Sequence, residues 1–328
     1  MKRFTAILFI LAAAVFSAAA KNVSFRTEDY SGTVVYSEKL KQGDALFARM
    51  NMHISRYAKK KNSSDVKAVL QLYRDNQKLD SAQFFFLNSK TRRQTAPDML
   101  AAIPLTRSLE PGSSYSIKII FSTGIQDENA KELILPFSLE SNPVKEVFME
   151  KNSDEAGKIQ FMSLERINQA EKISSILETI NASSLYSFKA FTPPLKDSVK
   201  KSSFGERTVF STEGQKSRTI TLSGNVYAAS DGTDVYACAE GKIMLAEYIA
   251  SSGWTVVIEH LPGLYSVYKN LGTVNVKNDS SIKQGEKLGL TGTSGTNPAS
   301  MFQWDVWLNN SPVNPDFFTS DFLFSSAE

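Results

Sequence analysis

The fold of the C-terminal part is decided by the stretch VVIEHLPGLYSVY, residues 256–268. It overlaps two β-rich runs, Thr255–Glu259 and Ser266–Tyr268, with Gly263 between them. β-Branched and aromatic residues favour strands, and glycine favours the tight turns that join them. Further glycines and β-rich runs continue on both sides, and no second long helical pattern occurs. The sequence therefore predicts an all-β domain over about residues 202–318.

The N-terminal half has the same strand character with a clearer alternation. Apolar and polar residues alternate over residues 46–54, 66–72, 115–121 and 133–139. Period two indicates strands that bury one face, and several short strands at this spacing are typical of an immunoglobulin-like β-sandwich. His53 falls on the face away from Met52, so we interpret it as an ordinary strand histidine.

Between the two β-rich regions lies one amphipathic segment. Ser153 begins a capping sequence, and apolar residues then recur three or four apart from Leu164 to Ile180. This spacing predicts one helix that ends near Asn181 and docks its apolar stripe on a neighbouring domain. Thr192-Pro193-Pro194 then marks a linker or an extended entry into the last domain.

The first residues are typical of a targeting segment. Lys2 and Arg3 precede a short apolar run, and small residues end at Ala20. This pattern predicts a secretory signal peptide, with a membrane anchor as the alternative. The net charge of the 328-residue chain is +3, and removal of the two basic residues lowers it to +1. The charge therefore gives no argument for nucleic acid as a partner.

The predicted organisation is mainly β, with a helical connection. Its parts are a signal peptide (1–20), a β-sandwich domain (21–141), a helix and linker (142–201), an all-β domain (202–320) and a tail (321–328).

The last domain resembles the M23 (LytM or lysostaphin-like) peptidoglycan endopeptidases. Seven segments match the family motifs in order: Ser203–Arg207, Asp231–Ile243, Val256–Tyr268, Ile282–Gly289, Thr291–Gly295, Asp305–Asn309 and Val313–Pro315. The resemblance implies an M23-like fold over about 115 residues and, in active members, a zinc ion that assists amide hydrolysis.

The catalytic positions of that family carry other residues here. The two ligands of the H-x-x-x-D motif fall on Leu222 and Val226. The histidine of Y-x-H falls on Asn270, and those of H-x-H fall on Met301 and Gln303. None of these side chains is a good zinc ligand or a proton shuttle near neutral pH.

The histidine count supports this interpretation. The chain has two histidines, and His260 matches a family position that is not a metal ligand. The single cysteine, Cys238, lies in an apolar run and is interpreted as buried and inert.

We expect the former catalytic groove to retain polar groups. The candidate binding residues are Asn270, Gln303, Asp305 and Tyr268, above a floor of Leu222, Val226 and Met301. The alternative is a site filled by simple repacking. Five aromatic residues could stack on sugar rings or belong to the core: Tyr227, Tyr236, Trp254, Tyr265 and Trp304.

Three alternative functions are consistent with this sequence. The first is a non-enzymatic, cofactor-free envelope module of the amidase-activator type, which binds peptidoglycan or a cell-wall hydrolase. The second is an active M23 metalloendopeptidase with unusual ligands. The third is a structural adaptor. All three place the protein outside the cytoplasm, in the periplasm or beyond, after cleavage near Ala20 and with no membrane span in the mature chain.

Overall fold

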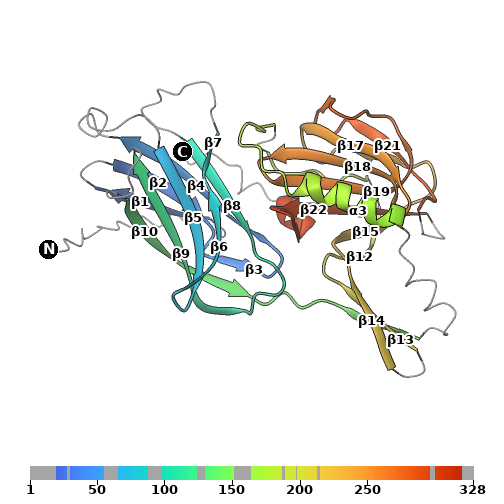
Figure 1. Ribbon diagram of the computed structural model, residues 1–328, viewed down its shortest axis with the longest axis horizontal. Helices are drawn as coiled ribbons and strands as arrows, with labels where there is room; N and C mark the ends of the chain where they lie inside the picture. The colour runs from blue at the N-terminus through green and yellow to red at the C-terminus, as the bar shows by residue number, and fades with distance from the viewer. Residues whose placement is uncertain are drawn as a thin grey trace. The chain divides into compact units, whose positions relative to one another are not determined.

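The computed structural model describes residues 20–27, 30–54, 66–87, 98–123, 130–150, 164–186, 189–196, 198–212, 215–295 and 300–319. These residues are mainly β, as the sequence predicts. The chain divides into two compact units, one that ends at Ser141 and one that begins at Asn142 (Figure 1). The predicted signal peptide, apart from Ala20, and the predicted start of the helix at Ser153 lie outside the described residues.

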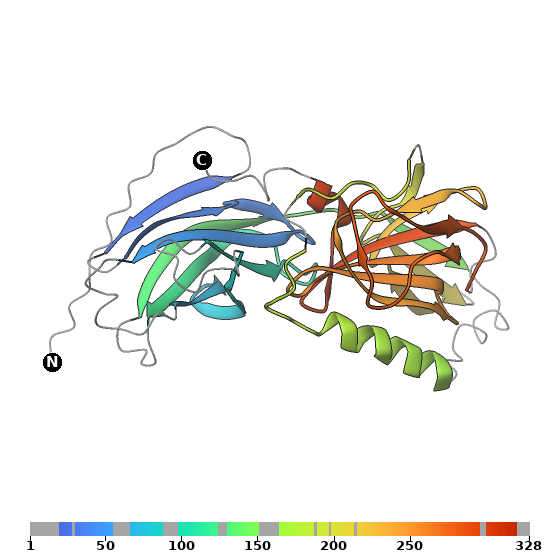
Figure 2. The ribbon, with the colours of Figure 1, turned by 90° about the horizontal axis from the view of Figure 1, so that it is seen from above.

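The N-terminal unit is built from two five-stranded sheets. The first has the order β1 (Lys21–Arg26), β2 (Tyr30–Tyr36), β4 (Ala45–Ile54), β8 (Asp98–Pro104) and β7 (Phe85–Phe86). The second has the order β3 (Lys39–Lys41), β10 (Lys131–Glu140), β9 (Gly112–Thr123), β5 (Val66–Arg74) and β6 (Gln77–Gln83). Figure 2 shows them as two layers of this unit.

The alternating residues of these strands form the core between the two sheets. Met50 and Met52 of β4 and Ile117 and Ile119 of β9 are fully buried. Phe121 of β9 contacts Phe25 of the other sheet at 5.1 Å between ring centroids. His53 is exposed on the opposite face of β4, as predicted. The two-layer packing is present, whereas the more specific immunoglobulin-like topology stays a prediction.

The C-terminal unit contains one large and one small sheet. The large sheet has the order β12 (Val199–Ser202), β15 (Gly224–Ala228), β22 (Met301–Leu308), β19 (Leu264–Val274), β18 (Gly253–Leu261), β17 (Gly241–Ile249) and β20 (Ser281–Ile282). β16 (Asp234–Tyr236) and β21 (Lys287–Thr291) pair with each other, β21 also pairs with β19, and β23 (Ser311–Val313) pairs with β22. The small sheet has the order β11 (Glu146–Glu150), β13 (Arg207–Thr212) and β14 (Gln215–Thr221). A 3₁₀ helix, η2, covers Pro315–Thr319.

The sequence 256–268 forms most of the central hairpin of this sheet. β18 and β19 pair antiparallel, with Val257 opposite Val267 and Leu261 opposite Leu264. Gly263 occupies the turn with φ of 75°, a left-handed conformation that a residue with a Cβ rarely adopts. The two β-rich runs and the glycine between them thus build the core of the unit.

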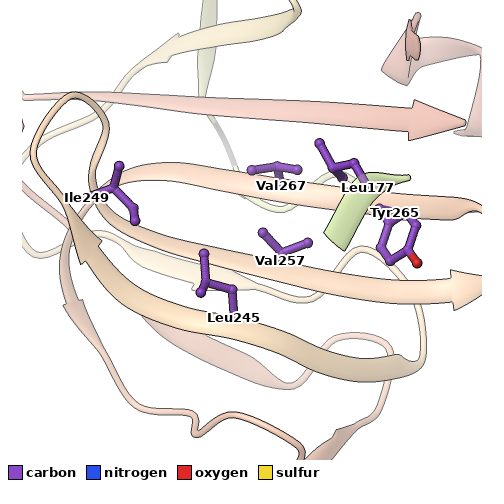
Figure 3. Close-up of a cluster of buried hydrophobic side chains, with 6 residues drawn as sticks. All are labelled: Leu177, Leu245, Ile249, Val257, Tyr265 and Val267. Atoms are coloured by element: carbon purple, nitrogen blue, oxygen red, sulfur yellow. The ribbon is translucent and has the colours of Figure 1, made fainter. Parts of the chain in front are cut away.

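One α-helix, α3 (Leu164–Leu177), occurs among the described residues. Leu177 packs into a cluster with Leu245, Val257, Tyr265 and Val267 of the large sheet (Figure 3). The stripe therefore docks on the sheet, as expected, with Ile173 and Ile176 partly buried against the same cluster.

The end of the helix differs from the prediction. α3 ends at Leu177 rather than near Asn181, and Ile180 is 60% exposed. The Thr179 amide donates to the Ile176 carbonyl, a tighter bond than that of an α-helix, and the Tyr265 hydroxyl donates to the Thr179 carbonyl at 2.6 Å. Tertiary hydrogen bonding at this point replaces the last helical turn.

The helix contact gives a testable prediction. Leu177→Ala should lower the free energy of unfolding of the C-terminal unit by about 2–4 kcal/mol, because it leaves a cavity between α3 and the sheet. The measurement is urea unfolding followed by tryptophan fluorescence, since all three tryptophans lie in this unit. Ile180→Ala is the matched control and should change little. Equal losses in both variants would contradict the packing.

Candidate functional site

Three neighbouring strands bring the predicted site residues together. β15 pairs with β22 so that Val226 lies opposite Gln303, and β22 pairs with β19 so that Gln303 lies opposite Lys269. Directly opposite residues share one face of a sheet, with Cβ atoms about 5 Å apart. Val226, Gln303 and Lys269 therefore form a row across one face of the large sheet.

Asp305 lies two residues after Gln303 on β22, so its side chain is on the same face of the sheet, and it is fully buried. Its Oδ2 accepts hydrogen bonds from the Lys269 ammonium at 2.5 Å and from the Ser223 hydroxyl at 2.7 Å. Its Oδ1 accepts from the Gln303 amide at 2.8 Å. We call Ser223, Lys269, Gln303 and Asp305 the Asp305 cluster. A buried carboxylate requires such compensation, because burial removes its hydration.

Gly224 makes room for this carboxylate. It lies directly opposite Asp305, and a Cβ on Gly224 would collide with Asp305 Oδ1 and with the Trp304 carbonyl oxygen. Glycine is the residue that permits so close an approach of backbone to a side chain. The motif glycine thus has a packing reason in this chain.

The three apolar positions lie on β15, on β22 or just before β15. Leu222, Val226 and Met301 are half-buried. The Leu222 backbone is hydrogen-bonded to Gly205 and Glu206, and the Met301 sulfur accepts from the Lys201 ammonium at 4.0 Å. Their side chains add no charge or strong metal donor to this face.

Asn270 is held away from the Asp305 cluster. It adopts φ of 62° and is 5% exposed. Its side-chain amide donates to the Ser294 carbonyl at 3.1 Å, and its backbone amide donates to the Ser252 carbonyl at 2.7 Å. These bonds give Asn270 a role in fixing loop geometry.

Tyr268 does not fit the expected groove. It lies on the opposite face of β19 from Lys269, is fully buried and packs 6.3 Å from the Phe302 ring. Its hydroxyl accepts a hydrogen bond from the Cys238 amide at 2.8 Å. The expectation for Tyr268 is corrected because successive strand residues point to opposite faces of a sheet.

That opposite face carries a second polar network, in which the side chains of His260, Ser266, Cys238 and Tyr268 are buried. The Nδ1 of His260 donates to the Glu240 carbonyl at 2.7 Å, so Nε2 accepts from the Ser266 hydroxyl at 2.7 Å. Cys238 Sγ lies 3.8 Å from His260 Nε2, and burial raises the pKa of this thiol to about 12. Cys238 is thus buried, as predicted, and its environment holds the thiol protonated.

The aromatic residues considered for sugar stacking divide between core and surface. Tyr227, Tyr265 and Trp304 are buried. Trp254 is 36% exposed and makes an edge contact with Tyr248, which is 50% exposed. Tyr236 is partly buried, and its hydroxyl donates to Asp234. The core interpretation holds for the three buried rings.

The Asp305 cluster is a poor set of zinc ligands. Zinc in proteins prefers imidazole, thiolate and carboxylate groups. Here one carboxylate accepts three hydrogen bonds, and an ammonium lies within 2.5 Å of it. A cation brought to this carboxylate would meet the positive charge of Lys269 at close range. Among the described residues there is no group of three or more His, Cys, Asp or Glu side chains arranged to hold a metal ion.

Sequence reasoning missed Lys269 and Ser223. Alternation along β22 placed Gln303 and Asp305 on one face, but it carries no information on which residues of β19 and β15 lie opposite them. The signal for Lys269 is its place between Tyr268 and Asn270, in the middle of a family motif.

Comparison with known proteins identifies the domain. The profile of peptidase family M23 matches residues 221–315. Residues 221–315 form a peptidase M23 domain. It contains the whole Asp305 cluster together with strands β15, β19 and β22.

The M23 domain is similar to both activators and enzymes. It is 33% identical over 92 residues to the murein hydrolase activator EnvC of Escherichia coli, which is 28% of this chain and 22% of EnvC. It is 28% identical over 97 residues to the peptidoglycan DD-endopeptidase ShyB of Vibrio cholerae, which is 30% of this chain and 23% of ShyB. The match thus spans less than a quarter of each relative's length. The names of both relatives refer to murein or peptidoglycan.

A solved M23 peptidase structure from Pseudomonas aeruginosa has the same fold over a larger part of the chain. Its TM-score is 0.50 at 19% identity, and the match covers 78% of this chain and 93% of that one. Within the described residues, no helix has the length and apolarity needed to cross a membrane.

The buried histidine predicts a pH dependence of stability. Desolvation lowers the pKa of His260 to about 4, below the value of about 6.5 of an unfolded histidine. Folded His260 therefore takes up a proton less readily than unfolded His260. The free energy of unfolding should fall by about 3 kcal/mol in total as the pH is lowered from about 6.5 to 4. The Glu259 carboxyl, whose pKa burial raises, acts in the opposite direction.

The measurement is urea unfolding by tryptophan fluorescence across this pH range. His260→Gln should flatten the pH dependence, whereas the control His53→Gln, on an exposed strand position, should retain it. An unfolding free energy of the natural chain that does not decline from pH 6.5 to pH 4 would contradict the assignment.

Proposed function

We propose that this protein is an exported envelope module with a catalytically degenerate M23 domain, which regulates peptidoglycan remodelling by binding rather than by hydrolysis. Its partner would be a cell-wall hydrolase of the amidase class or peptidoglycan itself. The proposal includes the signal peptide that ends near Ala20 and a site at the half-buried Gln303 and the apolar positions beside it.

The Asp305 cluster is the observation that carries this proposal. An ammonium, an amide and a hydroxyl surround the carboxylate of the site, and zinc-assisted hydrolysis needs a metal ion with an open coordination position. Without that ion, the domain lacks the group that polarises a peptide carbonyl. The similarity to EnvC, a murein hydrolase activator, supports the regulatory alternative.

The test is dye release from labelled peptidoglycan sacculi, with protein purified after expression of the full chain. Alone, the protein should release no dye. Added to a purified N-acetylmuramoyl-L-alanine amidase from the same organism, it should raise the amidase rate several-fold. Such a gain requires only that the protein binds the amidase or its peptidoglycan substrate.

Gln303→Lys should abolish the gain, because it adds a second positive charge beside Lys269. Gln77→Lys, on an exposed position of β6, is the matched control and should leave the gain unchanged. Dye release by the protein alone that a chelator stops would show an active metalloendopeptidase instead. If the protein neither raises the amidase rate nor binds to sacculi, the proposal is wrong and the structural adaptor is the remaining function.

A further inference from the structure

We propose that Lys269 is the resident cation of the M23 domain, which takes the electrostatic place of a metal ion and keeps metal out. This inference deepens the proposed function and rests on it for the identity of the site.

The sheet register places Lys269 directly beside the former ligand positions. Gln303, at a position where the M23 resemblance expects a ligand histidine, lies between Val226 on one neighbouring strand and Lys269 on the other. Val226 stands where the resemblance expects the ligand aspartate. The ammonium thus lies on the same face of the sheet as two of the three positions that would surround a metal.

The hydrogen bonds of the cluster converge on Asp305, the ion-pair partner of Lys269. Asp305 has no exposed surface, whereas the Lys269 side chain is 19% exposed. The buried carboxylate accepts bonds from Lys269, Ser223 and Gln303, so both of its oxygens have donors. A carboxylate engaged in this way has little capacity left to bind a cation.

The other ion pairs of the large sheet differ in burial. Lys242 pairs with Asp279 at 2.7 Å, but the Asp279 side chain is 81% exposed. Water can replace the Lys242 ammonium at that aspartate at small cost. Asp305 has no such replacement, so loss of the Lys269 charge leaves an unpaired buried carboxylate. The second role of Lys269 is therefore to stabilise the fold at this point.

This arrangement predicts that restored ligands alone will not restore metal binding. The first variant carries Leu222→His, Val226→Asp and Gln303→His, which supply the three ligands that the M23 resemblance implies. The second variant adds Lys269→Ala, which removes the ammonium and frees Asp305. Zinc chloride is titrated into each protein by isothermal titration calorimetry.

The second variant should bind one zinc ion at least about tenfold more tightly than the first, because a like charge no longer lies beside the metal. The matched control adds Lys242→Ala to the first variant and should bind zinc as the first variant does. Equal zinc affinities with and without Lys269, or an equal gain from the Lys242 change, would overturn the proposal.

A single substitution tests the same role if the multiple variants do not fold. Lys269→Met in the otherwise natural chain should lower the urea midpoint clearly more than Lys242→Met does. Equal midpoints would overturn the assignment. Both measurements are independent of amidase activation, so failure here leaves the proposed function standing, and failure of activation leaves Lys269 as the resident cation.

Discussion

The buried ion pair between Lys269 and Asp305 is the constraint on which the rest of the site depends. A carboxylate without solvent contact is costly unless opposite charge and hydrogen bonds compensate it. Here the compensation comes from three strands or their ends, because Ser223 precedes β15, Lys269 lies on β19 and Gln303 lies on β22. Gly224 is required on the remaining side, where a Cβ would occupy the space of the carboxylate.

The same face of the sheet also carries the docking site of α3. Val267, which lies opposite Asp305, belongs to the hydrophobic cluster that receives Leu177. Trp307, two residues after Asp305 on β22, packs against that cluster as well. One face thus holds a polar cluster over β15, β22 and β19 and an apolar helix contact over β17, β18 and β19.

Local patterns in the sequence predict the strands well because burial on one face imposes period two. The alternation around Met50 and Ile117 and the glycine at position 263 each specify their local structure. The end of the helix was not predictable from periodicity, because it is set by the Tyr265 hydroxyl at the Thr179 carbonyl, a contact between residues 86 positions apart.

The candidate site could be predicted only in part, for the same reason. Alternation along β22 correctly placed Gln303 and Asp305 together, as the hydrogen bond between them shows. The contribution of Lys269 depends on the register between β19 and β22, which sequence spacing within either strand does not contain. The motif Tyr268-Lys269-Asn270 suggests a groove position for Tyr268, but the register pairs Tyr268 with Trp304 on the opposite, buried face of the sheet.

The central claim is that a protein ammonium stands where a metal ion would be needed for hydrolysis. Its most direct test is the metal content of the natural protein, measured by inductively coupled plasma mass spectrometry after incubation with excess zinc chloride and gel filtration. We expect far less than one zinc ion per chain. One tightly held zinc ion per chain would contradict it.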